Sequence, residues 1–300
     1  MSLDFARTPD ERFADLPAWP FAPRYADDLA GSGLRMHYVD EGPPGAPVML
    51  CLHGQPTWSF LYRKMIPPFV AAGLRVVAPD LFGFGRSDKP TDDEVYTWDF
   101  HRASLLAFIE RLALRRFTLV CQDWGGLLGL TLPLDIPDAI ERLLVMNTAL
   151  ATGEPPGPGF MAWRQYVATQ PDFSISALMR RGTPGISEAE AAAYDAPFPD
   201  RSHRAGVRRF PLIVPIEPDM PGGEPSRRAA AWWRDRWRGP TFMAVGVLDP
   251  VLGLPAMERL REHIHGCPPP LVLTRAGHFV QEAGEEVAHA ALAHLARPGA

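Results

Sequence analysis

The feature that most constrains the fold of this chain is an apolar strand followed at once by a tight turn and a helix. Residues 117–121 are apolar and rich in β-branched side chains, as expected of a buried strand, and residues 127–130 predict the helix. Between them, Asp123 is flanked by the small residues Cys121 and Gly125. A nucleophile elbow needs small neighbours because its strained turn brings backbone segments close together. The alternative is that Asp123 only caps the helix, and this stretch alone leaves both interpretations open.

An aspartate at the tip of such an elbow favours chemistry at saturated carbon. A serine that attacks an alkyl carbon would form an ether, which has no carbonyl for water to attack. A carboxylate forms an alkyl ester instead, which water hydrolyses at its carbonyl. Asp123 therefore predicts displacement at an alkyl carbon followed by ester hydrolysis, with alkyl halides and epoxides as the obvious substrates.

The rest of the chain alternates buried strands with helices. Further strands are predicted from continuous apolar runs at residues 48–52, 75–80, 142–147, 241–248 and 270–274. Leu105, Phe108, Ile109 and Leu112 follow helical spacing, and a last helix is predicted from about residue 282 to 296. Such alternation predicts an α/β fold with a mostly parallel central sheet flanked by helices.

The strand signal disappears between about residues 151 and 225. Proline-rich loops bracket this segment, and three short helices are predicted within it, at residues 161–169, 175–181 and 187–194. Ligands of open α/β sheets bind at the carboxyl edge of the strands. We therefore expect a core domain of residues 1–150 and 226–300, with residues 151–225 forming a helical cap over that edge.

Composition excludes some partners. The formal charge of −5 on 300 residues gives no electrostatic reason to bind nucleic acid or an anionic membrane. No apolar run approaches the roughly 20 residues of a membrane helix, and the first 15 residues lack the apolar core of a signal peptide. The three cysteines do not form a disulfide framework. We expect a cytoplasmic, monomeric protein without a cofactor.

Two further strand ends carry the partners that a nucleophile at Asp123 would need. His278 follows the last predicted strand, and Asp249 follows the strand before it. The order Asp123, Asp249, His278 is the nucleophile–acid–base order of the α/β-hydrolases. The end of an earlier strand carries Asn147, which cannot supply the negative charge that orients and stabilises an imidazolium, so Asp249 is favoured as the acid.

Other residues supply candidate hydrogen-bond donors. Gln55 follows the first strong strand, where α/β-hydrolases take one oxyanion-hole N–H, and the second would come from Trp124. The indoles of Trp124 and Trp163 donate without accepting, which suits a departing halide, although a single indole is more often ordinary packing. His263 and His265 have no third ligand at a suitable spacing, so no metal site is predicted.

Several segments of the sequence resemble those of a known family. Segments 53–58, 83–88, 120–126 and 276–282 resemble those of the haloalkane dehalogenases, which are α/β-hydrolases with a helical cap, and the resemblance covers nearly the whole chain. It is greatest to the branch whose acid follows the later strand and whose second halide-binding tryptophan comes from the cap.

The resemblance implies a set of roles. In that branch, Asp123 would be the nucleophile, His278 the base and Asp249 the acid, with Trp124 and Trp163 binding the halide. The expected reaction converts a haloalkane and water to a primary alcohol, a halide and a proton through a covalent alkyl-enzyme ester. The best-known member of the branch carries Glu where this chain has Gln55, so rates and substrate preference do not carry over.

Two other functions share features of this sequence. Epoxide hydrolases share the aspartate elbow and the histidine base, and use cap tyrosines as acids, for which Tyr166 and Tyr194 are available here. Tyr166 lies three residues after Trp163 and is expected on the same helix face. A halide needs only donors, which favours the dehalogenase interpretation. A ligand receptor with this fold is the non-enzymatic alternative, and a complete triad argues against it.

Overall fold

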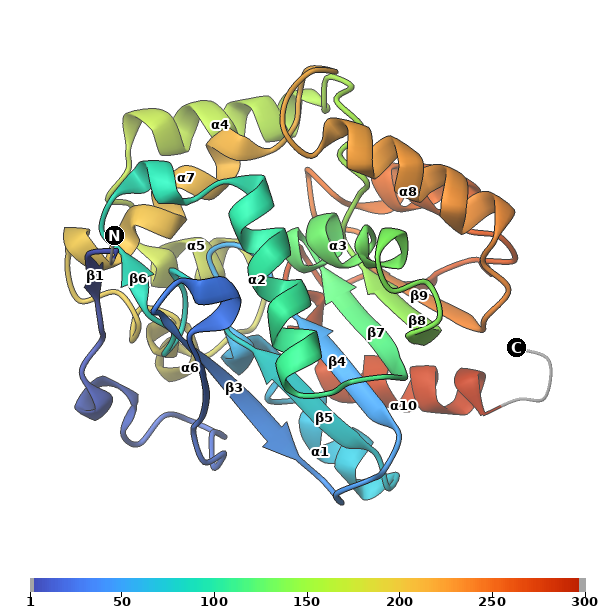
Figure 1. The fold of residues 1–300 in the computed structure, drawn as a ribbon, viewed down its shortest axis with the longest axis horizontal. Helices are drawn as coiled ribbons and strands as arrows, with labels where there is room; N and C mark the ends of the chain where they lie inside the picture. Colours follow the sequence, from blue (N-terminus) through green and yellow to red (C-terminus); the bar gives the residue numbers. More distant parts are fainter. Residues whose placement is uncertain (1–2, 297–300) are drawn as a thin grey trace.

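A computed structural model describes residues 3–296, which are organised around an eight-stranded sheet (Figure 1). The strand order is β10-β9-β8-β7-β4-β5-β3-β2. The strands are β2 (Arg24–Asp27), β3 (Arg35–Glu41), β4 (Val48–Leu52), β5 (Arg75–Pro79), β7 (Phe117–Gln122), β8 (Ile140–Met146), β9 (Thr241–Gly246) and β10 (Leu271–Leu273). All neighbours from β10 to β5 are parallel, whereas β3 is antiparallel to β5 and β2 to β3. The predicted mostly parallel sheet is therefore confirmed.

The sheet separates two apolar cores. Successive side chains of a strand point to opposite faces, so Leu119 and Cys121 join one core while Val120 joins the other. The core around Leu119 is covered by α2 (Trp98–Arg111), α3 (Trp124–Gly129) and α8 (Gly223–Asp235). The core around Val120 is covered by α1 (Ile66–Ala71) and α10 (Gly284–Leu295). Every residue of β4, β7 and β9 is buried, which explains their mostly apolar sequences.

The segment between β8 and β9 is helical. It contains α4 (Pro158–Thr169), α5 (Ile175–Gly182), α6 (Glu188–Ala193) and α7 (Ala205–Ile213), followed by α8. The strands β4 and β7 point toward this group, which lies beyond the carboxyl edge of the sheet (Figure 1). The three helices predicted there are present, whereas α7 was missed because Gly206 and Pro211 interrupt its apolar pattern.

The strands before residue 48 were also missed. β2 and β3 form a hairpin at the edge of the sheet, around Gly31 and Gly33, which both have positive φ. Only one residue of β2 is buried, so it lacks the continuous apolar run that marks the central strands. Two short strands, β1 (Phe5–Ala6) and β6 (Lys89–Pro90), form a separate antiparallel pair, and α9 (Leu254–Glu262) precedes β10.

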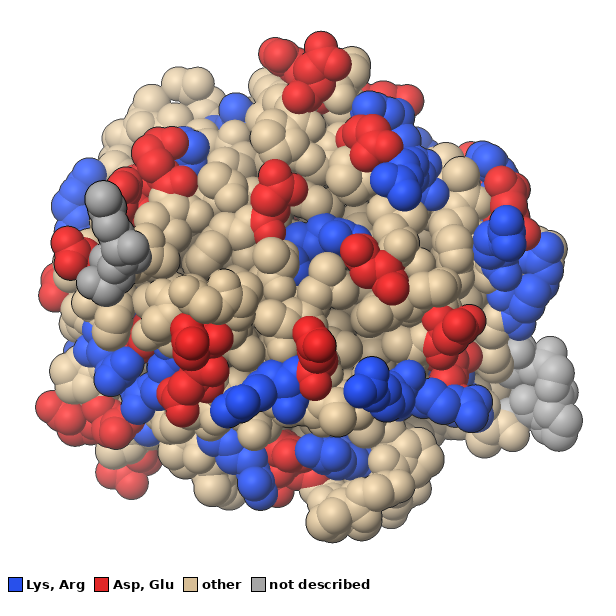
Figure 2. Space-filling model, viewed as in Figure 1, with Lys and Arg blue, Asp and Glu red and all other residues tan. Residues whose placement is uncertain are grey.

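The surface carries charges of both signs. Figure 2 shows lysine and arginine interspersed with aspartate and glutamate on the face that it draws, without a large patch of one sign. Among residues 3–296, no helix has the length and apolar character needed to span a bilayer.

Candidate active site

Asp123 lies in a sharp turn between β7 and α3. Its backbone has φ 49° and ψ −125°, a conformation that side-chain-bearing residues adopt only when the surroundings hold it. A Cβ at Gly125 would collide with the carbonyl oxygen of Leu52, and one at Gly126 would collide with Thr148. Gly125, one of the small residues that suggested an elbow, is therefore required by close backbone packing.

The carboxylate of Asp123 does not cap the helix. Although Asp123 precedes α3, its side chain makes no capping hydrogen bond to that helix. Its Oδ1 accepts a hydrogen bond from the backbone N–H of Gln55 at 2.8 Å, and the backbone N–H of Trp124 helps to lower the pKa of the carboxyl. The helix-cap interpretation is therefore wrong, and the two N–H groups predicted to form an oxyanion hole converge on this carboxylate.

His278 lies between two carboxylates. Its Nδ1 is 2.7 Å from Oδ2 of Asp249, and its Nε2 is 3.6 Å from Oδ2 of Asp123. The side chains of His278 and Asp123 are 19% and 17% exposed, whereas that of Asp249 is 1% exposed. The structure thus brings the three residues together in a chain that a small ligand can reach at the Asp123 end.

Asn147 supports Asp249, the candidate acid. Its Nδ2 donates to Oδ2 of Asp249 at 2.9 Å and to the carbonyl oxygen of Gly246, while its Oδ1 accepts from the N–H of Gly246. The N–H of Val251 donates to the other oxygen of Asp249. Asn147, which the sequence only excluded as an acid, therefore holds Asp249 in place.

The charges of Asp249, His278 and Asp123 affect one another's pKa values. Burial alone would raise the pKa of Asp249, but the charge and hydrogen bond of His278, with those of Asn147 and Val251, hold it well below its usual range. Burial lowers the pKa of His278, but the charge and hydrogen bond of Asp249 and the charge of Asp123 overcome this and raise it to about 9. Burial raises the pKa of Asp123, against the charge of His278 and the two backbone N–H groups.

Gln122 is a site residue that the sequence analysis missed. It ends β7, is fully buried, and its Nε2 is 3.0 Å from Nε2 of His278 and 3.2 Å from the carbonyl oxygen of His278. The available signal was a polar residue at the end of an otherwise apolar strand. Its contact with the ring of His278 places it directly beside the candidate base.

The two candidate halide donors lie in different surroundings. Trp124 is buried, and its ring packs against Phe210 of α7 with centroids 4.5 Å apart. Trp163 lies half-buried on α4 and packs against Tyr166 and Phe173, with centroids 5.8 and 5.3 Å apart. Within residues 3–296 the structure gives Trp163 no aromatic contact with Trp124.

Neither candidate tyrosine has a free, sheltered hydroxyl. Tyr194 is fully buried, and its hydroxyl donates to Oε1 of Glu282 and accepts from Arg63. Tyr166 is 38% exposed on α4.

Gln55 is buried beside the elbow, where its side chain donates to the carbonyl oxygen of Val207 at 3.0 Å, so the amide links the core to the start of α7.

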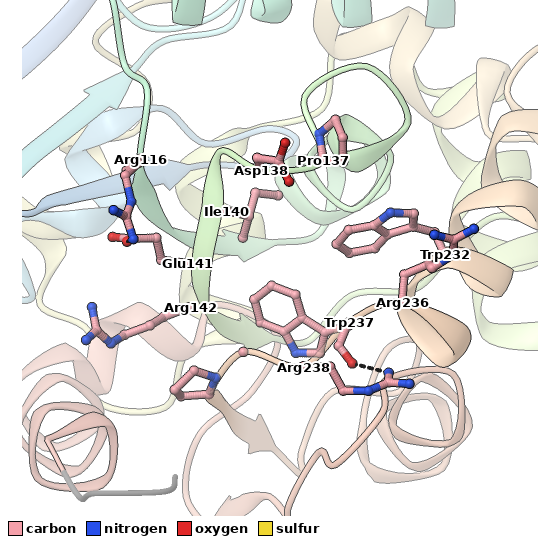
Figure 3. Close-up of a pocket in the computed structure, with 12 residues that line it drawn as sticks. Arg116, Pro137, Asp138, Ile140, Glu141, Arg142, Trp232, Arg236, Trp237 and Arg238 are labelled. Atoms are coloured by element: carbon pink, nitrogen blue, oxygen red, sulfur yellow. Dashed lines mark hydrogen bonds and ion pairs between the residues drawn. The ribbon is translucent and has the colours of Figure 1, made fainter.

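A large surface hollow lies away from these residues. It has a volume of about 680 Å³ and is lined by Trp232, Trp237 and residues at the starts of β8 and β9 (Figure 3). The starts of parallel strands form the edge of the sheet opposite to Asp123, and none of the candidate site residues lines the hollow. No cluster of three or more side chains suited to a metal ion occurs within the described part of the chain.

The known proteins that resemble this chain belong to one family. A family model for the alpha/beta hydrolase fold matches residues 47–285. Haloalkane dehalogenases of Psychrobacter cryohalolentis and Mycobacterium marinum are 45% and 46% identical, each over 95% of this chain and 96% and 98% of theirs. The structure of haloalkane dehalogenase DpaA from Paraglaciecola agarilytica is 49% identical, with a TM-score of 0.96 over 99% of this chain and 100% of that one.

That DpaA structure is described as tetrameric, which is at odds with the monomer expected from the sequence of this chain. The composition of a sequence reflects its charge and apolar content, and it carries no information on contacts between copies. High identity along nearly the full length, the shared fold and the aspartate elbow lead to one conclusion: the chain belongs to the haloalkane dehalogenases, hydrolases that act on carbon–halide bonds.

Proposed function

We propose that this chain hydrolyses haloalkanes in two steps, with Asp123 as nucleophile and His278 as base. The observation that carries the proposal is the chain of polar contacts at the tip of the elbow, in which His278 bonds to Asp249 and lies 3.6 Å from the carboxylate of Asp123. In the first step Oδ2 of Asp123 attacks the carbon that bears the halogen, and the halide leaves with the bonding electron pair. The products are a neutral alkyl ester on Asp123 and a free halide.

In the second step water attacks Cγ of the ester. His278 takes one proton of the water at Nε2, and Asp249 stabilises the resulting imidazolium through Nδ1. The negative charge that develops on Oδ1 is received by the N–H groups of Gln55, which already bonds to this oxygen, and of Trp124, the next residue along the chain. Collapse breaks the bond between Cγ and the alkoxy oxygen, and the alcohol leaves as Asp123 becomes a carboxylate again and one proton is released.

We further propose that the indoles of Trp124 and Trp163 bind the departing halide. Support comes from the position of Trp124 beside the nucleophile and from that of Trp163 on an inserted helix beyond the same edge of the sheet. We propose that helices α4–α7 act as a cap that shelters the site. The epoxide hydrolase alternative is less well supported, since an opened epoxide needs a sheltered acid, whereas Tyr194 is bonded to Glu282 and Tyr166 is exposed.

Replacing His278 with Gln should separate the two steps. Attack by Asp123 transfers no proton, so the alkyl ester should form, and without the base it should accumulate. Intact-protein mass spectrometry after incubation with 1-bromobutane should show one added butyl group, and one equivalent of bromide should be released. The double variant that also carries Asp123→Asn should show neither, and styrene oxide should give no turnover with the wild type. An unmodified mass for His278→Gln together with lost bromide release would contradict the proposed order of steps.

The oligomeric state belongs to the same proposal. Because DpaA is described as tetrameric and is 49% identical along the full chain, we propose that this chain also forms a tetramer. Analytical ultracentrifugation of the purified protein should give about four times the chain mass, and a single species at the chain mass would contradict the shared assembly.

A further inference from the structure

Gln122 is a buried amide in direct contact with the candidate base. It is the residue immediately before Asp123, and it shares a face of β7 with Val120. Its Nε2 contacts both the ring Nε2 and the main-chain carbonyl oxygen of His278, at 3.0 and 3.2 Å. One side chain therefore contacts the loop and the ring of the same histidine.

The carbonyl oxygen of His278 decides which end of the amide faces the ring. A carbonyl oxygen can only accept hydrogen bonds, so the NH₂ group of Gln122 must face it, and the same nitrogen then faces Nε2 of His278. The carboxylate of Asp249 likewise requires the hydrogen of the neutral ring to be on Nδ1. In this tautomer Nε2 carries a lone pair, and Gln122 donates to it.

We propose that Gln122 is a positioning residue that favours the neutral, proton-accepting form of His278 in the alkyl-enzyme. The inference rests on the proposed role of His278 as the base. Only the neutral ring can accept the hydrogen bond of Gln122, whereas a proton on Nε2 would face the amide hydrogens. The bond therefore stabilises the neutral ring, which can take a proton from water. The amide of Gln122 donates to the lone pair of Nε2 until a water molecule takes its place.

Two carboxylates act on the ring in the opposite direction. Asp249, after β9, and Asp123, after β7, are the charged groups that stabilise the imidazolium, and together they raise the pKa of His278 to about 9 in the free enzyme. Formation of the ester neutralises Asp123 and removes one of these causes. The donation from Gln122 then helps to lower the pKa further, at the stage of the reaction when a neutral imidazole is needed.

The test uses two variants of Gln122 and one control. Gln122→Met keeps a similar length without donors, and Gln122→Glu introduces an acceptor and a negative charge. Cys121→Ala is the matched control, because Cys121 is the preceding buried residue of β7 and packs on the opposite face of the sheet. Rapid-quench mass spectrometry with 1-bromobutane, from pH 5 to 10, follows both the formation and the decay of the alkyl-enzyme.

The decay rate should rise with pH as His278 becomes neutral. Loss of the donor should move its midpoint upward by about 0.5–1 pH unit in Gln122→Met, and further in Gln122→Glu, because the neutral ring loses a hydrogen bond. The control should keep the midpoint of the wild type. Equal losses of rate at every pH with an unmoved midpoint would mean that Gln122 only packs, and would overturn the inference.

The wild-type protein gives an independent reading if the variants fold poorly. Nitrogen-15 spectra of histidine-labelled protein above the pKa of His278 should show the Nδ1–H tautomer with Nε2 as a hydrogen-bond acceptor, and an Nε2–H tautomer would overturn the inference. The result is also distinct from a failure of the proposed function. If no alkyl-enzyme forms in the wild type or in any variant, the nucleophile is wrongly assigned, whereas an ester that forms and decays with an unmoved midpoint contradicts only the role of Gln122.

Discussion

The carboxylate of Asp123 is held in a polar setting before any substrate binds. Its Oδ1 is bonded to the N–H of Gln55, while Oδ2 is 3.6 Å from Nε2 of His278. The two oxygens are therefore inequivalent. In the proposed mechanism, Oδ1 receives the charge that develops during ester hydrolysis, and Oδ2 attacks carbon.

Replacing Trp163 with Phe removes a single hydrogen-bond donor from the proposed halide site. The substitution keeps most of the packing against Tyr166 and Phe173 and removes one N–H. A hydrogen bond to a charged group contributes about 1.5–3 kcal/mol, so halide binding should weaken by roughly ten- to a hundredfold. Carbon–halogen cleavage should slow, and more for chloride than for bromide, because chloride is the poorer leaving group.

Bromide quenching of tryptophan fluorescence measures the affinity. Trp232→Phe is the matched control, because Trp232 is also half-buried but lines the hollow at the opposite edge of the sheet. Bromide binding as tight in Trp163→Phe as in the control would remove Trp163 from the halide site. Loss of epoxide turnover in Tyr166→Phe would then favour the rival reaction.

At the scale of elements, a buried ionic cluster joins the insertion to the core. It consists of Arg63, Lys64, Glu190, Tyr194 and Glu282, and we call it the Arg63 cluster. Arg63 follows a short 3-10 helix of the core (Ser59–Tyr62) and donates to Glu190 of α6 and to both oxygens of Glu282, each at 2.7 Å. Glu190 also completes the capping box that begins α6. The cluster thus fixes α6 to the segment that follows His278.

Arg63→Met should destabilise the protein strongly. Glu282 is 4% exposed and would lose its main partner, and breaking a buried ion pair from one side typically costs about 3–5 kcal/mol. Glu190→Gln should cost less, because Glu190 is 19% exposed and the amide still accepts from Arg63. The free energy of unfolding in urea measures both effects.

Arg234→Ala breaks the surface pair of Arg234 with Asp235 and serves as the control, which should leave the unfolding free energy unchanged. A loss below about 1 kcal/mol in Arg63→Met would show that Lys64 alone compensates the charge of Glu282, against the reasoning from burial.

The sequence predicted the elements whose burial is uniform and missed those whose burial is mixed. β4, β7 and β9 are buried throughout and mostly apolar, and they were found within two residues of their bounds. β2 has a single buried residue, β3 has an irregular burial pattern, and α7 contains a proline, so none of them leaves a clean periodic signal. Contacts between side chains, such as those of Gln122 with His278, depend on rotamers that no sequence pattern specifies.

At the scale of the whole molecule, the order of strands and helices was enough to predict the fold and the edge at which the site lies. Parallel strands place their carboxyl ends together, so the residues after β7, β9 and β10 were expected to meet, and Asp123, Asp249 and His278 do meet there. The monomer expectation had no comparable basis, since no internal pattern reports which surface meets another copy.

The crowding around the elbow has an evolutionary consequence. A side chain at Gly125 would collide with the backbone of β4, one at Gly126 with Thr148, and one at Gly54 with Asp123 itself. Substitutions at these three positions are therefore removed by selection for folding before their effect on substrate choice matters. Descendants of this chain should acquire new substrate preferences through the helices inserted between β8 and β9, where residues can change without moving Asp123.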